Sequence, residues 1–223
     1  MYSGLRPERT LAQGTIFGSP YGMHSDLSSP ATTYTDTQGA LRTASASWWR
    51  SIKREPAALL DWLRKQYHGE HTAAWRIEEY ATAHVPDDSR WRAVLETIAA
   101  QERQHAGWVG ELLRTRGENP TPLDKEERYW RETLQAIDSL ETGAAVAAHA
   151  ENMRLARIEV IAGDQEPDAP ADIRDVFARI LTDERFHARA FTAMAGDAAL
   201  AKTRENHARG LAALGLINPD EVL

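Results

Sequence analysis

The sequence predicts an all-α protein, a four-helix bundle with a crossover helix, an N-terminal arm and a C-terminal helix. Three observations predict this fold. Apolar residues recur at three- and four-residue steps in four long segments. Turn-forming residues separate those segments, and no segment reads convincingly as a strand. A chain of 223 residues is long enough for one sizeable domain with its own core.

Two long helices are predicted in the first half of the bundle. The first begins at Pro56, a residue that suits a first helical turn, and ends near His84. The sequence Val85-Pro86-Asp87-Asp88 stops it. Asp88 or Ser89 can cap the second helix, which we expect to end near Gly117.

The second half of the chain is predicted to hold two more long helices and two shorter ones. A break over 119–122 precedes a short helix, and Gly143 marks a possible weak point in the helix after it. The expected ranges are about 124–139, 140–162, 171–195 and 198–214.

The segment before the bundle has a different composition. Residues 1–45 are rich in Gly, Ser, Thr and Pro and show no sustained period. We expect an extended or loosely ordered arm, or one that orders against the body or a partner subunit. Residues 46–223 then form the bundle with its C-terminal helix.

Composition excludes several classes of function. The net charge of −7, without a long run of one sign, argues against nucleic-acid binding. No stretch is apolar enough to span a membrane, and the N-terminus lacks the apolar core of a secretory signal, so a cytoplasmic location is expected. Because cysteine is absent, a metal site must use carboxylates and imidazoles, which suit iron or manganese.

One short motif occurs twice, as Glu102-Arg-Gln-His105 and Glu184-Arg-Phe-His187. With 19 glutamates and 8 histidines, chance alone gives roughly 0.7 matches, so the motif by itself is weak. Its placement matters more. Residues three apart lie on one face of a helix, so each motif can aim a carboxylate and an imidazole at one point.

Each motif lies in the second arm of a predicted helical hairpin. The first turn centres near residue 87, with Glu70 about 17 residues before it and the first motif about 17 after it. The second turn centres near residue 168, and Glu151 and the second motif are placed in the same way. Antiparallel arms rise equally per residue, so these groups meet roughly 25 Å from each turn. The predicted metal ligands are Glu70, Glu102, His105, Glu151, Glu184 and His187.

This set matches the ligands of a di-iron helical bundle, with one Glu from each of two helices and Glu-x-x-His from each of two others. Two divalent cations would offset the four buried negative charges. The alternative is that the motifs are solvated surface pairs. Glu70 has the polar neighbours His68 and His71, which leaves that alternative open, whereas Glu151 lies in an apolar stripe that is hard to place at a surface.

The order of these residues resembles the ferritin-like superfamily, especially its rubrerythrin-like and di-iron oxygenase branches. The strings QERQHAGW and DERFHARAF carry the resemblance, which covers roughly residues 56–195. It implies that Glu102 and Glu184 bridge two metals, that Glu70 and Glu151 are terminal ligands, and that each histidine binds one metal. It also implies parallel second and third helices, which the segment between them is long enough to connect.

Neighbouring residues suggest further roles. Rubrerythrin-type peroxidases carry an additional Glu one turn after the third-helix ligand, where this chain has Arg154. Arg154 can hold a substrate carboxylate or simply form a salt bridge. Asp183 can orient a histidine or lie exposed. Tyr67 can form a hydrogen bond to a metal ligand, pass an electron or be a core tyrosine. His149 and His71 are expected to point away from the metals.

Three functions fit these features. The favoured one is a non-haem di-iron, or Mn/Fe, oxidoreductase with two metal ions and O₂ as co-substrate, which hydroxylates, desaturates or otherwise oxidises a small organic molecule. It would need an external electron donor or a substrate that supplies electrons, and a homodimer is expected, without nucleic-acid or membrane partners. The alternatives are rubrerythrin-like peroxide reduction or ferritin-like iron oxidation and handling, and a metal-free helical interaction module. A sizeable cavity beside Arg154 would favour the organic substrate, and a sealed site would favour peroxide or iron chemistry.

Overall fold

A computed structural model describes residues 30–218, and the side chains from residue 39 on. The predicted all-α class is confirmed, and no strand occurs among the described residues. None of the helices in this part of the chain is both long and apolar enough to cross a membrane. The helices are α1 (Pro30–Ile52), α2 (Pro56–His84), α3 (Arg90–Arg114), α4 (Arg128–Thr133), α5 (Leu140–Ala162) and α6 (Ala171–Ala213), with a short 3₁₀ helix, η1 (Leu134–Ala136), after α4.

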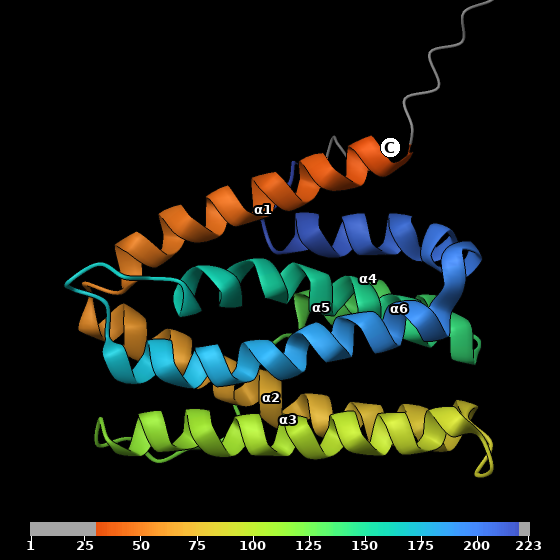
Figure 1. The fold of residues 1–223 in the computed structure, drawn as a ribbon, viewed down its shortest axis with the longest axis horizontal. Coiled ribbons are helices and arrows are strands. Elements are labelled where there is room, and N and C mark those ends of the chain that lie inside the picture. Colours follow the sequence, from red (N-terminus) through yellow and green to blue (C-terminus); the bar gives the residue numbers. More distant parts are fainter. Residues whose placement is uncertain (1–29, 219–223) are drawn as a thin grey trace, which may run out of the picture.

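Two helical hairpins form the bundle, α2 with α3 and α5 with α6 (Figure 1). Local signals set their ends. Pro56 opens α2, Ser89 caps α3 by accepting a hydrogen bond from the Trp91 amide, and Ser139 caps α5 in a reciprocal capping box with Thr142. The bounds of α2 and α5 are those that the sequence predicts.

The interior consists of two apolar cores that lie at opposite ends of the bundle. The Trp62 core contains Trp49, Leu59, Trp62, Leu63, Val109, Leu112, Leu113, Ile158, Ile161, Ile173, Phe177 and Ile180. The Phe191 core contains Ala81, Val85, Leu95, Ile98, Ala144, Ala145, Ala148, Ala190, Phe191, Met194, Ala195 and Ala199. Each of the four bundle helices, α2, α3, α5 and α6, contributes to both cores, so the middle of each of these helices lies between them.

The order in which the helices visit the two cores fixes their directions. Both α3 and α5 run from the Phe191 core to the Trp62 core and are therefore parallel. The segment between them must return along the bundle, and it carries α4 and η1. His68 of α2 holds this crossover segment through the Leu123 amide and Glu127. The predicted helix over about 124–139 is wrong in extent, because only 128–136 is helical and an extended approach covers the rest of the return path.

Part of the expected N-terminal arm is a helix that packs against the bundle, in keeping with the alternative that the arm orders against the body. Residues 1–29 lie outside the described residues, but from Pro30 onward the segment is helical as part of α1. Leu41, Ser45 and Trp49 recur every four residues and are all buried. Leu41 packs against Ala156 of α5 and Leu211 of α6. Packing against the bundle therefore stabilises a helix whose composition favours a loop.

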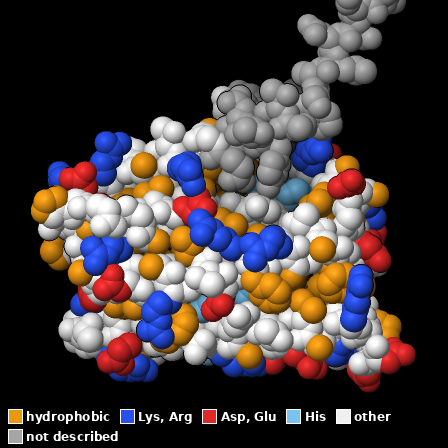
Figure 2. Space-filling view, in the orientation of Figure 1, with side chains coloured by type: hydrophobic (Ala, Val, Ile, Leu, Met, Phe, Trp, Pro, Cys, Tyr) orange, Lys and Arg blue, Asp and Glu red, His pale blue; other side chains and the backbone are white. Residues whose placement is uncertain are grey.

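The last helix bends once. Gly196 has the non-helical angles φ 68° and ψ 166°, which glycine adopts without the penalty of a Cβ atom. This kink lies where the sequence predicts a break between two helices. The part of α6 after the kink turns back along the bundle toward α1 (Figure 1). On the face that Figure 2 shows, acidic, basic and hydrophobic side chains are interspersed.

Candidate metal centre

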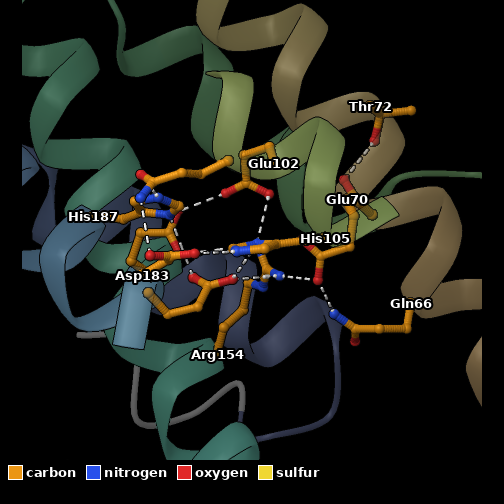
Figure 3. A network of polar contacts seen from close by, with 12 residues as sticks. Gln66, Glu70, Thr72, Glu102, His105, Arg154, Asp183 and His187 are labelled. Atoms are coloured by element: carbon orange, nitrogen blue, oxygen red, sulfur yellow. Dashed lines mark hydrogen bonds and ion pairs between the residues drawn. The ribbon is translucent and has the colours of Figure 1, made fainter. Parts of the chain in front are cut away.

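The six side chains singled out by the sequence converge at mid-bundle, between the two apolar cores (Figure 3). They form two groups in which one ligand atom of each residue lies within 4.8 Å of the others. The first group is Glu70, Glu102, His105 and Glu184, and the second is Glu102, Glu151, Glu184 and His187. Both groups contain Glu102 and Glu184, so these two carboxylates can face two positions at once.

Burial sets this cluster apart from an ordinary surface network. Five of the six side chains have no exposed surface, and Glu151 is 6% exposed. Figure 3 shows the carboxylates and imidazoles of different helices pointing toward one another. The alternative that Glu70 faces solvent is wrong, because the crossover segment covers its neighbour His68 and the bundle closes over Glu70 itself.

Most polar atoms at the centre of the cluster have no hydrogen-bond partner. These buried atoms are Oε2 of Glu70, both oxygens of Glu102, Nδ1 of His105, Oε2 of Glu151, both oxygens of Glu184 and Nδ1 of His187. Two of them, Glu151 Oε2 and Glu184 Oε1, form ion pairs with Arg154. A buried polar atom without a partner is costly, and native structures contain few. Oxygen and imidazole nitrogen atoms that converge in this way suit iron or manganese, so the cluster can bind metal.

The outer nitrogen of each imidazole is held by the opposite hairpin. His105 Nε2 lies 3.1 Å from Asp183 Oδ2, and His187 Nε2 lies 3.0 Å from Gln101 Oε1. Gln101 also donates to the second oxygen of Asp183 at 2.9 Å. In this arrangement each Nε2–H donates outward, which leaves the lone pair on Nδ1 directed at the cluster. Such outer partners fix the ring orientation that a metal ligand needs.

Arg154 supplies a positive charge at the edge of the cluster. Its Nη2 atom lies 2.6 Å from Glu70 Oε1 and 3.1 Å from Glu184 Oε1. Gln66 donates a hydrogen bond to the same oxygen of Glu70. Glu70 therefore divides its two oxygens, since Oε1 meets Arg154 and Gln66 while Oε2 faces His105 at 3.6 Å. Of the two roles that the sequence leaves open for Arg154, the structure shows the salt bridge.

The carboxylates differ strongly in their affinity for protons. Burial and the charges of Glu70 and Glu184 raise the pKa of Glu102 well above its ordinary value. Burial likewise raises the pKa of Glu184, although Arg154 opposes it. Burial acts to raise the pKa of Glu70 as well, but Arg154 and His105 outweigh it and hold that pKa below its usual range.

The histidines differ as well. Burial lowers the pKa of His187 to about 4, which keeps its imidazole neutral and able to donate a lone pair. Burial also acts against the charged form of His105, but its contacts with Glu70 and Glu184 prevail and raise its pKa. The raised pKa values of Glu102, Glu184 and His105 favour the binding of protons, which would offset part of the negative charge that a pair of divalent cations would otherwise offset.

Comparison with protein families matches residues 61–195 to the rubrerythrin family, which covers more than half of the chain and all six residues of the cluster. The chain belongs to the rubrerythrin family. This result confirms the resemblance to the ferritin-like superfamily. Comparisons with curated proteins and with solved structures found no match.

Other residues near the cluster take varied positions in this rubrerythrin-family chain. Tyr67 stacks on His71 at 5.9 Å between ring centroids and packs against the Trp62 core. Among the described residues it makes no hydrogen bond to the six, so its proposed role in electron transfer stays a prediction. His149 points away and stacks on His207 of α6.

Sequence reasoning missed Gln101 and Gln66. A signal for Gln101 exists, because it directly precedes the first Glu-x-x-His as Asp183 directly precedes the second. The two-fold repeat of the ligands thus extends to the residues that orient the histidines. Gln66 has a weaker signal, one turn before Glu70 on the same helical face.

Proposed function

We propose that this rubrerythrin-family protein is a di-iron, or Mn/Fe, oxidoreductase that activates O₂ to oxidise a small organic substrate. The observation that carries the proposal is a cavity of about 440 Å³ beside the cluster, with Arg154 and Gln66 in its lining. This volume lies in the ordinary range of small-molecule sites. A site that handled only peroxide or iron would not need such a space.

The chain's own residues suit this role. Glu70, Glu102, His105 and Glu184 would hold one metal, and Glu102, Glu151, Glu184 and His187 would hold the other. When bound, two ferrous ions would supply electrons for the reduction of O₂. Asp183 and Gln101 hold the imidazoles in place, and the apolar cores above and below exclude water from the cluster.

The electron balance requires a partner. Insertion of one oxygen atom into a C–H bond reduces the other oxygen atom to water, which consumes two electrons and two protons. The chain has no cysteine and therefore no iron–sulfur module of its own. An external reductant, or a substrate that is oxidised by two further electrons, would supply these electrons.

Peroxide reduction is the second candidate, and the family match favours it. Against it, Arg154 stands where rubrerythrin-type peroxidases carry an additional Glu, and its guanidinium is bound to Glu70 and Glu184. The cavity would also have no use in that reaction.

Metal loading followed by a comparison of oxidants tests the proposal. Protein loaded anaerobically with Fe(II) is expected to hold about two metals per chain. Glu102→Gln is expected to lower this to below about one, because Glu102 belongs to both ligand groups. Glu96→Gln is the matched control, since Glu96 lies exposed on the same helix.

In the presence of a reductant, the Fe(II)-loaded protein should then consume that reductant faster when O₂ is the oxidant than when H₂O₂ is the oxidant. Faster turnover with H₂O₂ would favour the peroxidase. Wild-type protein with less than about one metal per chain would contradict both enzymatic proposals.

A further inference from the structure

We propose that the cavity between α2 and α5 binds an organic carboxylate, with Arg157 as the anchor of the carboxylate group. The inference rests on the proposed function in one respect, because it names the substrate class of the same site. The cavity itself and its charge are independent of any metal. Its lining comes from α1, α2, the crossover segment with α4, α5 and α6.

The inner wall of the cavity reaches the metal centre. Gln66 and Arg154 both line it, and both contact Glu70 Oε1 (Figure 3). A molecule in the cavity therefore lies one side chain away from the candidate ligands. Apolar side chains, among them Trp62, Ile158 and Phe177, form much of the remaining wall and suit a hydrocarbon or aromatic body.

The acidic groups in the cavity lining are already neutralised. Glu127 accepts from Arg76 and lies 2.7 Å from His68 Nε2, while Glu126 is paired with Arg131. Lys125 and Arg128 line the same cavity and have no carboxylate partner among the described residues. The unbalanced charge of the lining is therefore positive, which favours an anionic ligand.

Arg157 is the cation best placed to bind that anion. One face of its guanidinium packs on the Trp48 ring at 4.3 Å, which fixes the plane of the group. Its Nε atom is buried without a hydrogen-bond partner, and within the described part of the chain it pairs with no carboxylate. Because burial removes water from this guanidinium, it lowers the pKa of Arg157. A flat guanidinium that has no carboxylate partner and lines a cavity can bind a carboxylate through its N–H donors.

Arg154 and Arg157 have different roles in this arrangement. They lie three residues apart on one face of α5 and both line the cavity. The charge of Arg154 is engaged by Glu70 and Glu184, whereas that of Arg157 is not. A ligand anchored at Arg157 would lie beside Arg154, which contacts the metal centre, with its apolar body against Trp62, Ile158 and Phe177.

Gly69 provides a way to close the cavity without disturbing the fold. It lies in the middle of α2 and lines the cavity, and a Cβ atom added there would meet nothing within 4 Å. A larger side chain at this position would occupy the space of the ligand. Gly107 of α3 is a matched control, because a Cβ atom there also meets nothing within 4 Å and the residue does not line the cavity.

Titration of the full chain with decanoate and with decan-1-ol, followed by tryptophan fluorescence, tests the inference. The two probes share an apolar chain and differ in charge. The wild-type protein is expected to bind decanoate at least about tenfold more tightly than the alcohol, because a charge-assisted hydrogen bond forms only with decanoate. Arg157→Gln should remove this difference, and Arg157→Lys should retain part of it.

Gly69→Leu should weaken the binding of both probes by about tenfold or more, whereas Gly107→Leu should leave both unchanged. Gly69→Ala, which fills less of the cavity, should give an intermediate loss and covers the case in which the leucine variant does not fold. Equal affinity for the two probes, no binding of decanoate at millimolar concentration, or unchanged binding to a folded Gly69→Leu variant would overturn the inference.

The same titrations on metal-free and Fe(II)-loaded protein separate this inference from the proposed function. Binding of decanoate by a protein that takes up no metal would support the cavity assignment and contradict the oxidoreductase. Two metals per chain without any decanoate binding would contradict the cavity assignment and would leave the proposed oxidoreductase supported.

Discussion

At the scale of single residues, the candidate centre is a problem of charge. Four buried glutamates lie close together. Arg154, which follows Glu151 by three residues on α5, places its positive charge next to them. Burial and mutual repulsion raise the pKa values of Glu102 and Glu184, which favours their protonated forms when no metal is bound. Arg154 therefore stabilises the metal-free protein, whereas divalent cations would take over part of its role.

The variant Arg154→Gln tests whether Arg154 stabilises the metal-free protein more than the metal-loaded protein. Loss of a largely buried cation leaves its carboxylate partners uncompensated, which is expected to destabilise the metal-free protein by on the order of 3 kcal/mol. The cost should be smaller in Fe(II)-loaded protein, because the metals offset the same carboxylates. Thermal unfolding with and without chelator measures the two costs, and an equal loss in both states would contradict the account.

The sequence predicts the six clustered residues because a repeat encodes them. A Glu is followed at an offset of 32 or 33 residues by Glu-x-x-His, and this pattern occurs twice. Because antiparallel helices rise equally per residue, equal spacing from the turn places these residues at the same height in the bundle. Arg157 and the cavity have no comparable signal. They depend on how α2, α5 and the crossover segment are separated in space, which no local period of the sequence records.

At the scale of helices, small residues set close approaches. The sequence suggests Gly143 as a weak point of α5, but the structure gives it a packing role. A Cβ atom there would lie 2.2 Å from Cε2 of Tyr80, whose hydroxyl is fixed by the Leu140 carbonyl. Gly143 therefore allows α2 and α5 to meet at the end of the bundle that contains the Phe191 core.

Gly143→Ala is expected to destabilise the protein by about 1–3 kcal/mol through overpacking against Tyr80. Gly107→Ala, at a helical position with open space, should instead stabilise it by about 0.5–1 kcal/mol, since alanine restricts the unfolded chain. Denaturant unfolding measures both values. A neutral or stabilising Gly143→Ala would show that Tyr80 can move aside.

The helix that sequence reasoning missed shows the limit of local patterns. Among the α1 side chains that the structure describes, from residue 39 on, only Leu41, Ser45 and Trp49 are buried, and one of them is a serine in a segment rich in Ser and Thr. The bounds of α2 were predictable because proline at the start and a turn sequence at the end punctuate a strong period. The helical structure of α1 depends on packing against distant parts of the chain, and no local sequence signal marks where such a helix begins or ends.

At the scale of the whole molecule, one buried cation ties the end of α1 to the turn between α5 and α6. Lys53 Nζ lies 2.8 Å from Asp164 Oδ2 and 2.6 Å from Asp168 Oδ1, and its side chain is 1% exposed. Trp49 Nε1 donates to the same oxygen of Asp164 at 2.7 Å. This contact helps to hold α1 over the bundle and beside the cavity.

The contact should be sensitive to acid. The hydrogen bond from Lys53 lowers the pKa of Asp168 to about 2, below the ordinary value of about 3.9. A carboxyl group whose pKa is lower in the folded state stabilises that state above its unfolded pKa, and the contribution is lost as pH falls toward 2. Tryptophan fluorescence, to which Trp49 contributes, should therefore change over this range, and Asp168→Asn should remove much of the change. An identical profile in the variant would assign the acid response to other groups.

The central claim is that side chains from four helices converge on a pair of metals. Anomalous diffraction at the iron absorption edge, from crystals of protein loaded anaerobically with Fe(II), measures this most directly. The account predicts two peaks inside the bundle, one beside Glu70 and His105 and one beside Glu151 and His187, with Glu102 and Glu184 between them. No peak, or a single peak outside these side chains, would contradict it.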